Sequence, residues 1–192
     1  MNYTDIRQPV KSVSKKANQI LLILSASWLI AISAQFSINL PFSPVPITGQ
    51  TLIILLIGAL LGKNRGAAAV GLYLAQGAAG LPVFAGGKSG LITLFGPTGG
   101  YLIGFAAAAY VVGILMELRY NKSLLYTGFS LLVGNLIIYT FGLFWLAKFV
   151  GESQALQLGL LPFLAGDLLK ILLGVTILGS SQKIMSIYMS RG

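Results

Sequence analysis

The stretch GLPVFAGGKSGLITLFGPTGGY, residues 80–101, decides how this chain can fold. It contains seven glycines and two prolines, although the sequence on both sides is apolar enough to form membrane helices. Gly and Pro interrupt regular backbone. In a bilayer, irregular backbone is stable only where protein or a water-filled cavity satisfies its polar groups. The stretch therefore either caps a helical bundle or lines a site, and its one charged side chain, Lys88, favours a site.

The composition is that of an integral membrane protein with a single domain, residues 1–192. Of its residues 56% are hydrophobic and 9% are charged, whereas soluble domains average about 25% charged residues. All polar segments are short, so we expect no separate soluble domain. The net charge of +9 comes from basic residues that flank apolar runs. Such flanking charges indicate membrane topology and contact with anionic lipid rather than nucleic acid.

The chain has neither cysteine nor histidine, and this excludes several kinds of chemistry. Disulfides, Cys/His zinc sites, haem ligation and His-dependent triads all need these residues. An intramembrane aspartyl protease would need two Asp residues within the membrane, and only Asp167 qualifies. We therefore expect no enzyme, no metal site and no cofactor. Residues 1–17 lack the pattern of a cleaved signal peptide and are predicted to be a cytoplasmic lead-in.

Hydropathy predicts an all-α bundle of six membrane-spanning helices. Each span needs about 20 apolar residues. The predicted spans are 18–38, 47–61, 66–81, 98–116, 123–147 and 163–181. The second and third are short and bounded by Gly or Pro. Interrupted segments of this kind are typical of substrate sites in transporters.

Basic residues are distributed unevenly between the two sides of this bundle. Six spans place both termini on one side, which then carries Arg7, Lys11, Lys15, Lys16, Lys63, Arg65, Arg119, Lys122, Lys183 and Arg191. The other side carries only Lys88 and Lys148, and Lys170 lies inside the sixth span. Because loops rich in Lys and Arg stay inside the cell, both termini are predicted to be cytoplasmic. Residues 80–101 and the start of the sixth span then lie at the outer face of the plasma membrane.

The strongest candidate for a binding group is the pair Asp167 and Lys170, which share one helix face. Charges inside a membrane are costly and by default mark functional sites. A helix cap beside a lysine that reaches toward the interface, or a structural ion pair, would explain the same two residues without a ligand.

Uncharged polar and aromatic side chains are expected on the same side as this pair. They are Gln35, Asn39, Thr48, Gln50, Gln76, Thr98 and Tyr101, with Phe36, Phe42, Phe84 and Phe95. Each could also be a loop contact or a helix cap. Taken together they would form apolar walls with a few polar anchors, which is the usual build of a small-molecule site.

Two short fragments only superficially match known motifs. Ala85-Gly-Gly-Lys-Ser89 has Pro82 where a P-loop requires glycine, and it lies on the side away from cytoplasmic ATP. Thr98-Gly-Gly-Tyr101 differs in order from the potassium-channel filter. We therefore expect neither nucleotide binding nor a channel.

Small residues stand four apart in the first span, at Ser27 and Ala31. This spacing lets helices approach closely in lipid. The close contact could be with another helix of the same chain or with a second membrane protein, and the sequence leaves both interpretations open.

Five segments, in order and with compatible spacing over about residues 40–175, form a specific pattern. They are Pro44–Thr51, Leu60–Gly62 with its basic turn, Gly77–Gly87, Gly96–Leu102 and Gly166–Lys170. Together they resemble the BioY family, the biotin-specific S components of energy-coupling factor transporters.

The resemblance implies a six-helix S-component bundle that binds biotin from outside. It also implies partnership with a transmembrane T component and two cytoplasmic ATPase subunits, so that ATP is used only by the partners. Some family members are thought to work without that module. The S component is held to topple in the membrane when it docks. The face with Ser27 and Ala31 resembles the docking surface of such proteins, with Ser27 where Ala is commoner.

Biotin would bring a ureido ring with two N–H groups and a carbonyl, an apolar bicycle and a carboxylate. We expect Asp167 to accept from a ureido N–H with Lys170 beside it, and Lys88, near Tyr101, to bind the carboxylate. Exchanged roles for the two lysines are an alternative. The family often has Arg at the position of Lys88. Compared with Arg, Lys88 supplies only a point charge. The remaining candidate contacts are Gln50, Thr48, Gln76 and Phe84.

The competing interpretation is a stand-alone secondary transporter of biotin or a related small carboxylate, coupled to protons through Asp167. An acid that already pairs with Lys170 is a poor proton carrier. This favours a binding protein that its partners energise.

Overall fold

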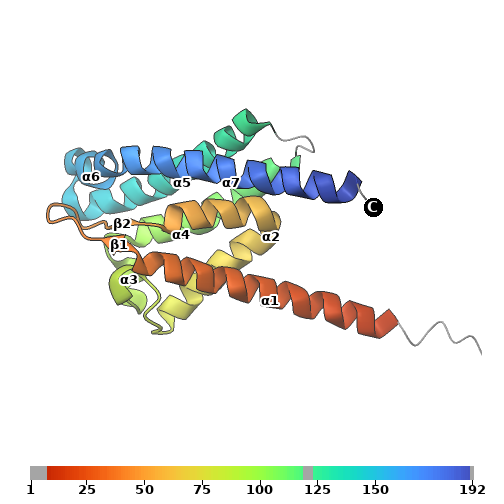
Figure 1. Cartoon of the computed structure of the whole chain (residues 1–192). Helices are drawn as coiled ribbons and strands as arrows, with labels where there is room; N and C mark the ends of the chain where they lie inside the picture. The colour runs from red at the N-terminus through yellow and green to blue at the C-terminus, as the bar shows by residue number, and fades with distance from the viewer. Residues whose placement is uncertain (1–7, 119–122, 191–192) are drawn as a thin grey trace, which may run out of the picture.

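The computed structural model describes residues 8–118 and 123–190, with the side chains of residues 16–118 and 123–180. Arg7, Arg119, Lys122 and Arg191 of the charge count lie outside the described residues. The described chain is almost entirely helical (Figure 1). Its helices are α1 (Gln8–Gln35), α2 (Gln50–Ala78), α3 (Leu91–Phe95), α4 (Gly99–Leu118), α5 (Leu124–Val150), α6 (Glu152–Gly159) and α7 (Leu164–Ser190).

Short elements join these helices. A hairpin with two strands of two residues each connects α1 to α2, with β1 (Ser37–Ile38) antiparallel to β2 (Ile47–Thr48). Two 3₁₀ turns, Ala85–Gly87 and Leu161–Phe163, lie before α3 and α7. The 80–101 stretch therefore consists of a 3₁₀ turn, the short α3 and the start of α4.

Six long helical segments run through the described bundle, because α2 is two helices joined at a break. Gly62 has φ 78° and ψ 175°, a conformation that glycine adopts at little cost. The amide of Lys63, which starts the second half, donates to the Glu117 carboxylate at 2.9 Å. With α1, α4, α5 and α7 the two halves give the six-helix bundle that hydropathy predicts, and five of the described helices, α2 counted once, are long and apolar enough to cross a membrane.

The helix ends agree with the predicted spans within a few residues, with two larger differences. α1 begins at Gln8 and so includes much of the predicted lead-in, because Pro9 is tolerated in the first turn of a helix and no helix breaker follows it. α7 continues to Ser190, beyond the predicted end at residue 181.

The core lies where α2, α4 and α5 meet, with α1 packed against α2 and α7 against α5 and α2. α2 and α4 approach closely at Gly58, where an added Cβ would lie 2.6 Å from the Ala109 carbonyl oxygen. Small residues of this kind let membrane helices pack backbone to backbone.

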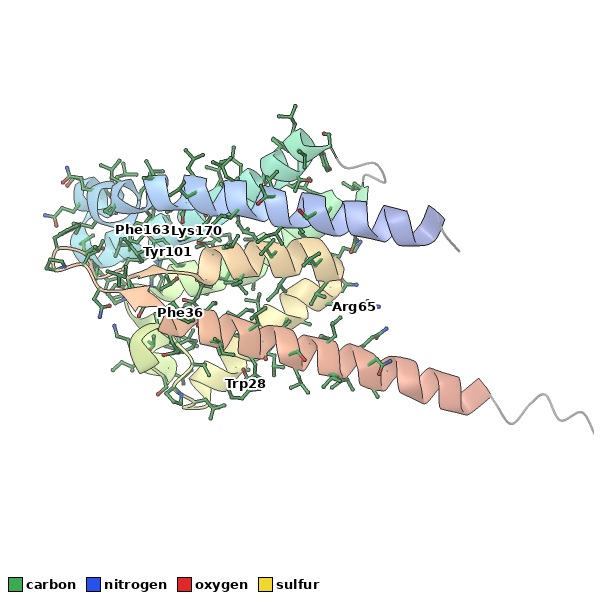
Figure 2. The ribbon with its side chains drawn as sticks, viewed as in Figure 1. Trp28, Phe36, Arg65, Tyr101, Phe163 and Lys170 are labelled. Atoms are coloured by element: carbon green, nitrogen blue, oxygen red, sulfur yellow. The ribbon has the colours of Figure 1, made fainter. Side chains whose placement is uncertain are left out.

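The bundle has two different ends (Figures 1 and 2). The N-terminal end of α1, the C-terminal end of α7 and Arg65, next to the break in α2, lie at one end. The hairpin, α3 and α6 lie at the other. An even number of spans brings both termini to the same end, and the candidate site lies at the opposite end, beside the hairpin and α3.

Candidate ligand-binding site

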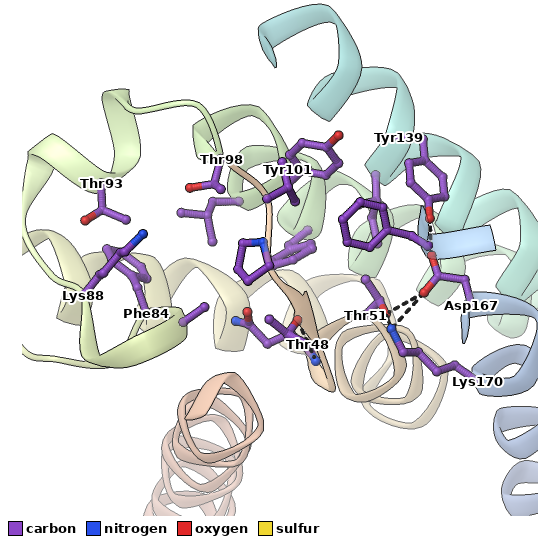
Figure 3. Close-up of a pocket in the computed structure, with 18 residues that line it drawn as sticks. Thr48, Thr51, Phe84, Lys88, Thr93, Thr98, Tyr101, Tyr139, Asp167 and Lys170 are labelled. Carbon is purple, nitrogen blue, oxygen red and sulfur yellow. Dashed lines mark hydrogen bonds and ion pairs between the residues drawn. The ribbon is translucent and has the colours of Figure 1, made fainter. Parts of the chain in front are cut away.

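A pocket of about 710 Å³, part of it open to solvent, lies among the hairpin, the 80–101 stretch and the start of α7 (Figure 3). Its apolar lining is Val45, Pro46, Phe84, Ala85, Leu102, Phe105, Ile138 and Phe163. Its polar lining is Thr48, Gln50, Thr51, Lys88, Thr93, Thr98, Tyr101, Tyr139, Asp167 and Lys170. Apolar walls with a few polar groups are typical of a site for a small organic molecule.

The Asp167 carboxylate accepts hydrogen bonds from four protein side chains. Its Oδ1 atom lies 2.9 Å from Lys170 Nζ and 3.4 Å from the Thr51 hydroxyl. Its Oδ2 atom accepts from the Tyr139 hydroxyl and, at 3.2 Å, from the Asn135 amide. A carboxylate offers about four acceptor positions, so these donors use its capacity.

Three helices place these groups. Asp167 lies in the first turn of α7, where the helix dipole favours a negative charge. Asn135 and Tyr139 are one turn apart on α5, and Thr51 lies in the first turn of α2. Asp167 is only 5% exposed. Because a buried charge is stable only when it is paired and hydrogen-bonded, this cluster ties α2, α5 and α7 together.

Lys170 keeps one donor for a ligand. Its ammonium group has three N–H bonds, and two of them point to Asp167 and to the Thr51 hydroxyl, the latter at 3.1 Å. No acceptor for the third lies within the described residues. Since Lys170 lines the pocket, this N–H is available to a carbonyl or carboxylate oxygen.

Lys88 lies on the other side of the pocket from Asp167 and Lys170 (Figure 3). It is exposed, and among the described residues it has no ion-pair partner. Its carbonyl accepts from the Phe84 amide at 3.0 Å, which closes the tight loop 84–88. The Phe84 ring is buried and packs edge-on against Tyr73, with 5.5 Å between ring centroids. The pocket therefore has a cation on each of two sides and aromatic and apolar surface between them.

Two predicted contacts take other roles in the structure. Tyr101 lines the pocket, as expected of a residue near Lys88, but its hydroxyl donates to the Gly159 carbonyl at 2.9 Å, so its ring is the part left to contact a ligand. Gln76 is not part of the lining. Its side-chain oxygen accepts from the Ser27 hydroxyl at 3.4 Å, because it lies on the side of α2 that packs against α1.

The predicted apolar walls are only partly correct. Phe84 lines the pocket, whereas Phe36, Phe42 and Phe95 are 74%, 59% and 66% exposed and lie outside it. Of the other polar candidates, Thr48, Gln50 and Thr98 line the pocket, and Gln35 and Asn39 do not. The amide of Gln35 instead donates to backbone carbonyls at Ala31, Val83 and Phe84.

Ser27 and Ala31 are not a docking surface in this structure. They are 0% and 4% exposed, and the Ser27 side chain contacts Gln76 of α2. A buried residue offers no surface to a partner, so the docking interpretation is wrong for these two residues. The four-residue spacing is explained by packing within the chain.

The sequence-based site lacks several residues that the structure brings to it. They are Thr51, Thr93, Asn135, Tyr139, Phe105 and Phe163. For Asn135 and Tyr139 a signal exists, since they stand four apart in the largely apolar run 123–147. Polar groups at helical spacing in a membrane span indicate one functional face.

Comparisons with known proteins agree with one another. A model of the BioY family matches residues 7–186. The probable biotin transporter BioY of Pyrococcus horikoshii is 38% identical over 163 residues, which cover 84% of this chain and 94% of the relative. The biotin transporter BioY of Thermotoga maritima is 41% identical over 141 residues, which cover 73% of this chain and 82% of the relative.

The fold also matches a solved structure. The crystal structure at 2.1 Å of the S-component for biotin from an ECF-type ABC transporter superposes with a TM-score of 0.79 and 28% sequence identity. The match covers 88% of this chain and 93% of that one.

Proposed function

This chain belongs to the BioY family, and from that membership we propose that it is the biotin-capturing S component of a membrane transporter. The observation that carries the proposal is the pocket with Lys170 on one side, Lys88 on the other and apolar and aromatic surface between them. Two separate cations suit a ligand that has an acceptor at each end.

Biotin has groups that fit this arrangement. Its ureido carbonyl can accept the third N–H of Lys170, and its carboxylate can pair with Lys88. The bicycle and the aliphatic chain can pack against Phe84, Phe105 and Phe163. Apolar walls with a few polar anchors provide affinity and orientation together.

In the proposed site, Asp167 positions the Lys170 side chain and does not itself bind the ligand. The sequence suggests that Asp167 itself accepts from a ureido N–H, but four protein donors already occupy it. We assign to it the orientation of the ammonium group and the compensation of its charge. This support matters because an unpaired buried ammonium is strongly unfavourable.

The assignment of Lys88 is tested with two ligands, biotin and biotin amide, which lacks the carboxylate charge. Lys88→Ala should weaken the binding of biotin by about ten-fold, the scale of a charge-assisted contact. It should weaken the binding of the amide much less. Lys148→Ala is the matched control, because that lysine is also exposed but stacks on Phe144 and Trp145, outside the pocket. If Lys88→Ala weakened the binding of both ligands equally, the assignment would be contradicted. If Lys170→Met instead weakened the binding of biotin more than that of the amide, exchanged roles of the two lysines would be supported.

We propose the plasma membrane as the location, with both termini in the cytoplasm, and a T component with two ATPase subunits as the source of energy. The proton-coupled alternative needs an acid that can release and take up a proton, whereas Asp167 is held by four donors, one of which is the ammonium of Lys170. Purified protein in liposomes should bind biotin but accumulate it only after the partner subunits are added. Accumulation by the protein alone under a pH gradient would favour the alternative.

A further inference from the structure

Gln50 offers the pocket an acceptor that no group in the described part of the chain uses. The residue is 3% exposed and lines the pocket. Its side-chain nitrogen donates to the Tyr73 hydroxyl at 2.7 Å, whereas its carbonyl oxygen Oε1 has no donor within the part of the chain that the structure describes. Among the buried side-chain atoms there, only Asn135 Oδ1 is both sealed and unpaired. Gln50 Oε1 is therefore open to the pocket.

Tyr73 fixes the direction of this amide. The break at Gly62 folds the second half of α2 back, and this brings Tyr73 close to Gln50 in the first turn of the same helix. Tyr73 is fully buried, and its ring packs at 84° against the Phe84 ring. With the nitrogen of Gln50 held by a fixed hydroxyl, its oxygen is directed elsewhere, so Tyr73 acts as a positioning residue.

Gln50 lines the same pocket as Lys170, to which we assign the carbonyl of a urea. It directly precedes Thr51, whose hydroxyl contacts both Asp167 and Lys170. A cyclic urea carries an N–H directly beside its carbonyl. Because Gln50 and Lys170 line the same pocket, a ligand whose carbonyl accepts from Lys170 can offer its adjacent N–H to Gln50, whereas the acceptor positions of Asp167 are already used.

We infer that Gln50 Oε1, oriented by Tyr73, is the acceptor that recognises a ligand N–H and so selects cyclic ureas over analogues that lack this donor. The inference rests on the proposed function and adds a specificity-determining residue to it. An acceptor left unpaired in a buried site is costly, and this cost is the basis of the discrimination.

The test compares biotin with its two cyclic carbamate analogues, in each of which one ring N–H is replaced by oxygen. For the unmodified protein in detergent, one carbamate should bind about ten-fold more weakly than biotin. The ratio of the two dissociation constants, that of this carbamate over that of biotin, should fall toward one in Gln50→Met. In Tyr73→Phe it should fall part of the way. Gln50→Glu, which keeps an acceptor oxygen, should retain the discrimination.

Three controls separate this role from a general structural one. Gln76→Met changes a glutamine outside the pocket, and Tyr110→Phe changes a half-exposed tyrosine on α4; both should leave the ratio unchanged. Asp167→Asn should weaken biotin and both carbamates alike. A ratio that persists in Gln50→Met and Tyr73→Phe but is lost in Asp167→Asn would overturn the inference. Failure of the unmodified protein to bind biotin would instead overturn the proposed function.

Discussion

The Asp167–Lys170 pair shows how a charge is kept inside an apolar bundle. The two side chains are 6% and 19% exposed. Thr51 contacts both of them, whereas Asn135 and Tyr139 donate to Asp167 alone. Each partner compensates the other, so the loss of one leaves a buried charge without a counter-ion. The stability of the site should therefore depend on the pair more than on either residue.

This dependence gives a prediction for single and double variants. Lys170→Met should lower the free energy of unfolding by about 3 kcal/mol, because it leaves Asp167 buried and unpaired. Lys170→Met with Asp167→Asn should recover much of that loss. The measurement is denaturant or thermal unfolding in detergent. Lys63→Met is the control: its ion pair with Glu117 is more than 40% exposed on both sides and should contribute about 1 kcal/mol or less. A single variant as stable as the double would contradict this account.

The Tyr101 hydroxyl should matter for stability but not for the ligand. Tyr101→Phe leaves the Gly159 carbonyl without its donor, which should cost about 1–3 kcal/mol. The affinity for biotin should change little, because the ring that lines the pocket is kept. Parallel unfolding and binding measurements check this, and a large loss of affinity in a normally stable variant would show that the hydroxyl does reach the ligand.

Sequence reasoning located the charged residues of the site but not their neighbours. Asp167, Lys170 and Lys88 could be predicted because charges in apolar or glycine-rich surroundings need an explanation. The direction of the Tyr101 hydroxyl depends on where α6, which packs on α5, brings the Gly159 carbonyl, and no local pattern encodes this. In the same way, the contact of Tyr139 with Asp167 depends on how α5 and α7 are rotated relative to each other.

The break in α2 is the feature that divides one long helix into two segments. The backbone turns at Gly62, and the Glu117 carboxylate accepts from the first amide of the second half. The carboxylate thus replaces the hydrogen bond that the interrupted helix loses. The position of the second half, and with it Tyr73 and Phe84, depends on this turn.

Gly62→Ala should therefore destabilise the protein. The combination of φ 78° and ψ 175° is unfavourable for any residue with a Cβ, by about 1–3 kcal/mol, and the added methyl group would meet the Glu117 carboxylate. Gly71→Ala is the control, since an added Cβ there meets nothing within 4 Å. Thermal unfolding of the two variants should show a clear loss only for Gly62→Ala. Equal stability would mean that the turn does not need glycine.

Hydropathy predicted the long helices well and the short ones not at all. α6, Glu152–Gly159, falls in a segment that was expected to be a loop, and α3 has only five residues. Helices this short are marginal in isolation and form because they pack on the bundle. The sequence marks where α5 ends, at Gly151 with φ 84°, but does not indicate that another helix follows at once.

The arrangement of the two ends predicts which residues face which side of the membrane. The chain has no cysteine, so single cysteines can be introduced without further changes. Glu152→Cys in α6, at the end that carries the pocket, should react with a membrane-impermeant maleimide in intact cells. Asn64→Cys, near the opposite end, should react only after permeabilisation. The reverse pattern would place the pocket on the cytoplasmic side and contradict uptake from outside.

The six-helix architecture follows from hydropathy and charge, because membrane helices need apolar length and basic residues set their direction. The pocket does not follow from these alone. It depends on α2 folding back at Gly62 and on the hairpin, the 84–88 loop and α7 meeting at one end. These contacts join residues far apart in the chain, so only the structure shows that Lys88 and Lys170 border the same cavity.

Equilibrium binding of biotin to the purified protein tests whether this pocket captures the vitamin. We expect saturable one-to-one binding that is reduced by Lys88→Ala, abolished by Lys170→Met, and not displaced by an excess of a medium-chain fatty acid, which has the carboxylate but not the urea. Absence of binding by the folded protein, or displacement of biotin by the fatty acid at similar concentrations, would contradict this expectation.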